Sequence, residues 1–188
     1  MSMCNDDCKA TVVEYERKIS ELKDQLRKKD RELQKKDREL QKVNFEHTIL
    51  PNNQSVLIKY KGILKDIIIP NEIDGFPITY IDHNVFAGSK FTNITIPNSV
   101  GQIGGNAFGR NQLTNIKIPN SVTYIGKCAF SYNKLTNIQI SNSVSELKYG
   151  VFMNNELTNI QIPNSVTCIC SNAFCNNKLT NIQIPNSV

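Results

Sequence analysis

Apolar side chains recur with a period of 22 residues along the stretch 64–188. The copies begin at Leu64, Phe91, Leu113, Leu135, Leu157 and Leu179; the first carries an insertion of five residues, and the last is incomplete. A coil of 22 residues cannot enclose a core by itself, whereas stacked coils share continuous apolar columns. The pattern therefore predicts a solenoid in which each coil packs on the next.

Within each copy, the apolar positions predict short extended segments. In the copy from Leu113, Ile116 and Ile118 flank one polar residue, so both side chains lie on one face of a strand. Pro119 then ends the strand because proline cannot donate to a sheet ladder, and Val122-x-x-Ile125 marks a second extended segment. We therefore expect parallel stacked strands that form one long sheet.

The polar positions of the same strands form two outward-facing columns. Because side chains alternate along a strand, Asn115 and Lys117 point away from the core, as do their equivalents in the other copies. The first column is Asn93, Asn115, Asn137, Asn159 and Asn181, and the second is Thr95, Lys117, Gln139, Gln161 and Gln183. Solenoids use such extended faces for binding. We predict a protein-binding surface here, with the more varied second column as its recognition column.

Two alternatives compete with this interpretation of the polar columns. In the first, the asparagine and glutamine side chains only hydrogen-bond to one another along the stack and have a structural role. In the second, recognition lies in the variable connectors around Arg110, Tyr132, Asn154 and Asn176. A third, broader alternative makes the whole protein a structural or assembly protein in which the solenoid is a spacer.

The residues before the repeats predict a long helix. The stretch 11–43 has no proline or glycine, and apolar residues recur every seven positions at Val12, Ile19, Leu26, Leu33 and Leu40. The second heptad set is Tyr15, Leu22, Lys29, Lys36 and Val43, and its two lysines weaken a coiled-coil core. We expect a weak homo- or hetero-oligomer through residues 11–43, or else a solvated stalk. The predicted domains are a charged helix at 1–43, a linker and capping strand at 44–63, and the solenoid at 64–188.

The repeats resemble a known family. The motif L-T-N-I-x-I-P-N-S-V-T-x-I-G-x-x-A-F is similar to the BspA-like leucine-rich repeats, and the resemblance covers about residues 55–188, with Ser55–Tyr60 as an N-terminal capping strand. It implies a β-rich leucine-rich-repeat solenoid, preceded here by the N-terminal helix. It also implies protein binding, often at the surface of bacteria or anaerobic protists, and it carries over no catalytic residue.

One repeat position departs from the family's usual pattern. The family commonly has cysteine three residues after the phenylalanine, whereas this chain has Asn111, Asn133, Asn155 and Asn177 there. A buried asparagine can satisfy backbone groups of the connectors through its side chain. We therefore expect this column to be structural and to leave the fold intact.

Charge and hydropathy exclude several partners. The net charge of +5 is not concentrated, since residues 1–43 hold 12 basic and 10 acidic side chains, so we expect no nucleic acid. No stretch reaches the roughly 18 apolar residues of a membrane span, and the first residues lack the pattern of a secretory signal. These features predict a cytoplasmic location, whereas the family resemblance suggests the cell surface by a non-classical route.

The cysteines and histidines predict no chemistry. The six cysteines of a chain without a recognisable signal are expected to be free thiols. The spacing of Cys168, Cys170 and Cys175 fits no zinc pattern, and His47 and His83 have no nucleophile or carboxylate in a recognisable order. The sequence therefore predicts neither a metal nor a cofactor, and it predicts a binding protein rather than an enzyme.

Overall fold

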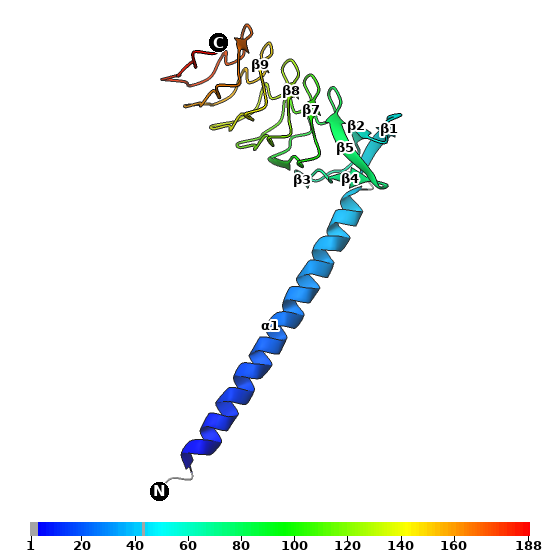
Figure 1. Cartoon of the computed structure of the whole chain (residues 1–188), viewed down its shortest axis with the longest axis vertical. Helices are drawn as coiled ribbons and strands as arrows, with labels where there is room; N and C mark the ends of the chain where they lie inside the picture. The colour runs from blue at the N-terminus through cyan, green and yellow to red at the C-terminus, as the bar shows by residue number, and fades with distance from the viewer. Residues whose placement is uncertain (1–3, 43) are drawn as a thin grey trace. The chain divides into compact units, whose positions relative to one another are not determined.

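The computed structural model describes residues 4–42 and 44–188, with side chains at 13–36 and 44–188. The chain contains two compact units that divide between Leu40 and Gln41. The first unit is helical, and the second is a β-solenoid whose coils follow one another toward the C-terminus (Figure 1).

Helix α1 spans Cys4–Lys42, which is 39 residues, and it begins seven residues before the predicted start. Exposed ion pairs stabilise its surface: Arg17 contacts both Glu14 at 2.7 Å and Glu21 at 2.6 Å. Such pairs one turn apart favour the helix weakly, because solvent screens them. Three predicted heptad positions lie outside the described part of the chain. The structure describes no side chain at Val12 and Leu40, and it does not describe Val43.

The heptad side chains with described positions are exposed. Ile19, Leu26 and Leu33 have 50%, 61% and 60% of their surface accessible, and Tyr15 and Leu22 are similarly open. Helix α1 thus presents exposed apolar side chains at coiled-coil spacing.

The solenoid begins with a hairpin. Strand β1 (Phe45–Ile49) pairs antiparallel with β2 (Ser55–Tyr60), and β2 pairs parallel with β5 (Phe76–Ile81). Strand β2 therefore joins the hairpin to the first coil, at the position expected of a capping strand. The five-residue insertion of the first copy builds β4 (Glu72–Ile73), which pairs antiparallel with β5 through a turn with positive φ at Asp74 and Gly75.

Two parallel ladders run along the solenoid instead of one long sheet. The more continuous ladder uses the second extended segment of each repeat: β2 and β5 continue into β7 (Gln102–Ile103) and β8 (Tyr124–Ile125), and β9 (Glu146–Leu147) pairs with β10 (Cys168–Ile169). The Ile-x-Ile segments form β3 (Asp66–Ile68) and β6 (Asn93–Thr95), followed by isolated bridges.

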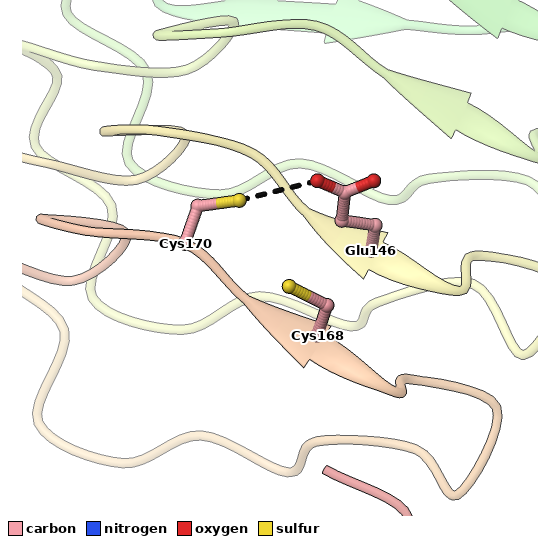
Figure 2. Close-up of side chains that lie close together, drawn as sticks. All are labelled: Glu146, Cys168 and Cys170. Atoms are coloured by element: carbon pink, nitrogen blue, oxygen red, sulfur yellow. Dashed lines mark hydrogen bonds between the residues drawn. The ribbon is translucent and has the colours of Figure 1, made fainter.

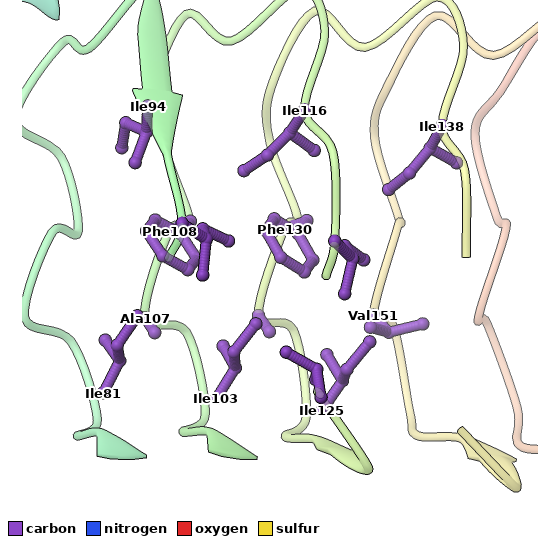
Figure 3. Close-up of a cluster of buried hydrophobic side chains, with 14 of the residues drawn as sticks. Ile81, Ile94, Ile103, Ala107, Phe108, Ile116, Ile125, Phe130, Ile138 and Val151 are labelled. Atoms are coloured by element: carbon purple, nitrogen blue, oxygen red, sulfur yellow. The ribbon is translucent and has the colours of Figure 1, made fainter. Parts of the chain in front are cut away.

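The core consists of the predicted columns. Figure 3 shows three of them as rows: Ile94, Ile116 and Ile138; Phe108 and Phe130; and Ile81, Ile103 and Ile125. The phenylalanine rings stack from coil to coil, with centroids 5.2 Å apart between Phe108 and Phe130 and 5.8 Å apart between Phe130 and Phe152. The predicted apolar columns are therefore confirmed as a continuous core, except at the two ends of the repeats, where Leu64, Ile182, Ile184 and Val188 are exposed.

The buried asparagine column joins neighbouring coils, as expected. The Asn133 side chain accepts a hydrogen bond from the backbone N–H of Leu113 at 3.1 Å and donates to the carbonyls of Phe108 and Phe130 at 2.9 and 3.2 Å. Asn111, Asn155 and Asn177 make the equivalent contacts in their coils. Each asparagine thus satisfies backbone groups of its own coil and of the preceding one.

Candidate functional site

The predicted outward columns form one exposed surface, which we call the ladder face. It comprises Asn93, Thr95, Asn115, Lys117, Asn137, Gln139, Asn159, Gln161, Asn181 and Gln183, and all ten side chains are exposed. The isoleucines that alternate with them, such as Ile116 and Ile118, are buried. Parallel bridges connect Lys117 to Gln139, Gln139 to Gln161, and Gln161 to Gln183, which sets the side chains of the second column in register.

The amides of the ladder face do not hydrogen-bond to one another. In the part of the chain that the structure describes, no side-chain hydrogen bond joins neighbouring members of either column. Amide pairs do form elsewhere on the surface: Asn106 donates to Asn84 at 2.7 Å, and Asn176 donates to Asn154 at 2.8 Å. The donors and acceptors of the ladder face are therefore turned to the solvent.

The ladder face is hollowed over its C-terminal coils. A recess of about 1300 Å³ is lined by Asn137, Gln139, Asn159, Gln161, Asn181 and Gln183, together with Thr158, Thr180, Asn142 and Asn164 beside them. Ile138, Ile140, Ile160, Ile162, Pro163 and Ser165 complete the lining, and no charged residue is among the lining residues. Such a surface can offer many neutral donors and acceptors to an extended polar ligand.

The variable connectors form a second surface with a different backbone. Arg110, Tyr132, Asn154 and Asn176 all have φ between 54° and 57°, and Gly88 has φ 67° in the same column. Asparagine and glycine tolerate this left-handed region, whereas Arg110 and Tyr132 hold it at a cost of roughly 1–3 kcal/mol each. The Arg110 guanidinium lies over the Tyr132 ring at 5.2 Å, a cation–π distance.

His83 has a carboxylate partner that is adjacent in sequence. Asp82 Oδ1 lies 2.8 Å from His83 Nδ1 and also accepts the backbone N–H of His83, which lowers the pKa of Asp82. Tyr80 Oη lies 3.2 Å from the same nitrogen, and burial raises the pKa of this phenol. Among the described residues, no serine, threonine or cysteine hydrogen-bonds to His83. This arrangement lacks the nucleophile–base pair of a hydrolytic site.

A cluster of two cysteines and one glutamate lies on the ladder that contains β9 and β10, where sequence spacing predicted no metal site. Cys168 and Cys170 lie beside Glu146, and one ligand atom from each residue lies within 4.8 Å of the other two (Figure 2). The third residue is Glu146 rather than Cys175. The repeat period could have identified Glu146 as a neighbour of Cys168. Residue 146 lies 22 positions before residue 168, so the two occupy equivalent positions in adjacent coils.

The cluster has a defined electrostatic environment. The Cys170 thiol donates to Glu146 Oε1 at 3.2 Å, and this carboxylate, together with burial and Cys168, raises the pKa of Cys170 to about 11. The Lys148 ammonium contacts the other oxygen of Glu146 and, with the thiol hydrogen bond, lowers the pKa of that carboxyl group.

Comparison with known proteins identifies the repeats. A profile of the BspA type leucine rich repeat region matches residues 79–188 in six copies. Among solved structures, the chain is similar to a leucine rich repeat protein of T. pallidum, with 26% identity and a TM-score of 0.70; the match covers 76% of this chain and 70% of that one. It is also similar to a leucine rich cell surface protein of Faecalibacterium prausnitzii, with 26% identity, a TM-score of 0.62, and 77% and 48% coverage.

A third structure shares the fold. The pneumococcal vaccine antigen PcpA is 20% identical, with a TM-score of 0.60, and the match covers 76% of this chain and 48% of the antigen. The chain thus spans about half the length of two of these three proteins.

No curated protein matches the sequence. Among the described residues, no helix has the length and apolar character needed to cross a membrane. Because the family profile covers more than half of its 188 residues, the chain belongs to the BspA type leucine rich repeat family.

Proposed function

We propose that the solenoid is a non-enzymatic protein-binding module whose ligand contacts the ladder face. The observation that carries this proposal is the ladder face itself: ten exposed polar side chains stand in two registered columns without hydrogen bonds to their neighbours. A purely structural amide ladder would engage these groups along the stack, as the Asn106–Asn84 pair does in the connectors. An extended protein segment can use the open donors and acceptors.

The second column supplies the specificity in this proposal. Thr95, Lys117, Gln139, Gln161 and Gln183 differ more from coil to coil than the all-asparagine first column does, and Lys117 is the only charged residue in either. An exposed charge at one defined step of a neutral ladder fixes the register of a ligand, because an opposite charge must lie beside it.

Binding through the ladder face is tested with one triple variant and one matched control. The full chain captures its partner, and the affinity of the purified pair is then measured for Lys117→Ala/Gln139→Ala/Gln161→Ala. The loss should exceed about 1 kcal/mol if these residues are hot spots, while the melting temperature stays unchanged.

The control variant is Arg110→Asn/Tyr132→Asn. Asparagine already occupies the same connector column with positive φ at Asn154 and Asn176, so the backbone is preserved. Unchanged affinity in the control supports the ladder face. Loss of affinity in the control alone places recognition in the connectors instead.

Helix α1 favours a second, compatible role as an oligomerisation element or spacer. Ile19, Leu26 and Leu33 are exposed at heptad spacing, and Tyr15 and Leu22 lie on the neighbouring heptad set. Burial of such side chains between helices would stabilise an oligomer, whereas Lys29 and Lys36 in the second set would weaken it. This role leads to the alternative function, a structural or assembly protein in which the solenoid acts as a spacer.

The assembly role is tested by sedimentation of the full chain. A concentration-dependent oligomer that becomes a monomer in Leu26→Gln/Leu33→Gln, but not in the control Asp30→Gln, supports it. A monomeric parent protein contradicts self-association and leaves the helix as a spacer or as a site for a different chain.

The cellular location of the protein can also be tested. The F. prausnitzii relative is named a cell surface protein, and a binding face on a surface protein meets proteins of other cells. The cytoplasm is the alternative location. Limited protease treatment of intact cells distinguishes the two, because only a surface-exposed chain is cleaved before lysis.

A further inference from the structure

The cluster of Glu146, Cys168 and Cys170 is independent of the ladder face. Strands β9 and β10 are parallel neighbours, and their register places Cys168 opposite Glu146. Cys170 follows Cys168 by two residues, so both thiols lie on the same side of the chain. Figure 2 shows the three side chains turned toward one another from two successive coils.

The three groups offer the donor set of a soft metal ion. Thiolates select zinc-class ions over magnesium and calcium, which prefer oxygen ligands alone. Zinc–sulfur and zinc–oxygen bonds of about 2.3 and 2.0 Å place the ligand atoms of a tetrahedral site roughly 3.5–3.8 Å apart. The ligand atoms here lie within 4.8 Å of one another, and Cys170 Sγ and Glu146 Oε1 are already 3.2 Å apart. Small side-chain rotations close the remaining gap.

We propose that Glu146, Cys168 and Cys170 bind one zinc-class divalent ion, with water at the fourth position. Cys168 is exposed, and Glu146 and Cys170 are half-buried, so the ion can enter from the solvent. On binding, the Cys168 and Cys170 thiols lose their protons to the solvent and coordinate as thiolates. Lys148 keeps its contact with the second carboxylate oxygen and holds Glu146 in place from outside the coordination sphere.

The bound ion would link two adjacent coils of the solenoid. Glu146 belongs to the copy that begins at Leu135, whereas both cysteines belong to the copy that begins at Leu157. The core becomes more exposed beyond this point, since Phe174 and Leu179 are only partly buried. An ion that binds only the folded arrangement stabilises it in proportion to the logarithm of its concentration. The site would therefore stabilise the C-terminal coils.

The test uses Cd²⁺ and Zn²⁺ as probes of the full chain in a non-thiol reductant. A Cys4→Ser/Cys8→Ser background removes the two N-terminal thiols as competing ligands. In this background, calorimetry should give one Zn²⁺ per chain, Cd²⁺ should produce the thiolate-to-metal charge-transfer band, and Zn²⁺ should raise the melting temperature.

Variants assign the ligands. Cys168→Ser/Cys170→Ser should abolish the charge-transfer band and the Zn²⁺-induced stabilisation, and Glu146→Gln should weaken binding by at least about tenfold. The control Cys175→Ser removes a thiol of the same coil that lies outside the cluster, and it should bind as the background protein does. A band and stoichiometry that survive in Cys168→Ser/Cys170→Ser, or that disappear equally in Cys175→Ser, would overturn the proposal. Failure to bind either ion in the background protein would also overturn it.

Discussion

Two asparagine columns run the length of this solenoid, and they differ in almost everything except their period. Asn133 is 7% exposed, and its side chain satisfies backbone groups of two coils. Asn137, four residues later, is exposed, and its amide makes no hydrogen bond to a neighbouring amide of its column. Repetition of one amino acid every 22 residues is therefore compatible with a purely structural role or with an open surface. Only the environment of the side chain separates the two.

The largest expected effect comes from the buried column. Asn133→Ala removes the acceptor for the Leu113 N–H and the donor for the carbonyls of Phe108, Phe130 and Ser131. The three carbonyls keep a donor, because Asn111, Asn155 and the backbone N–H of Arg110 also donate to them. Only the Leu113 N–H loses its partner, so the free energy of unfolding should fall by about 1–3 kcal/mol, the cost of one buried backbone group without a partner. Urea unfolding of the full chain measures this. A loss below about 1 kcal/mol would mean that water replaces the side chain.

A third set of asparagines, in the connectors, should give an intermediate effect. Asn106 has φ 54° and donates to Asn84 at 2.7 Å on the exposed surface. Asn106→Ala removes this bond and places alanine in the left-handed region, which should cost about 1–2 kcal/mol. Asn106→Gly removes the same bond, but glycine adopts this backbone conformation without strain. Its melting temperature should therefore be closer to that of the parent protein. Equal melting temperatures for the two variants would exclude backbone strain as the cause.

The smallest effect on stability is expected from the exposed column. Asn137→Ala should change the free energy of unfolding by no more than about 0.5 kcal/mol, because the side chain has no partner to lose. The same urea experiment that measures Asn133→Ala provides the comparison. A destabilisation by Asn137→Ala similar to that of Asn133→Ala would show that the ladder face is structural after all.

Sequence reasoning was most successful where burial repeats with the period. Residues such as Ile116, Phe130 and Val122 were predicted to be core residues because each coil needs the same apolar side chain at the same place, and all three are buried. The structural role of Asn133 was predictable for the same reason. The stack of coils gives these positions identical neighbours, so one repeat informs every other.

Features that depend on a break in the pattern were harder to predict. The sheet was expected as one ladder, but the Ile-x-Ile segments after β6 pair only through isolated bridges, and the segments that include Tyr124 and Cys168 pair more regularly. The hairpin strand β1 lies before the repeats and has no equivalent in them. The contact of Glu146 with Cys170 joins residues 24 positions apart, so local ligand spacing could not reveal it.

We propose that the ladder face binds a partner while the buried asparagine column holds the coils together. The most direct test of this proposal measures partner affinity and melting temperature on the same preparations of the Lys117→Ala/Gln139→Ala/Gln161→Ala variant. The affinity should fall by more than about 1 kcal/mol, and the melting temperature should stay unchanged. An unchanged affinity with a lowered melting temperature would contradict the proposal, and would make the exposed columns part of the scaffold.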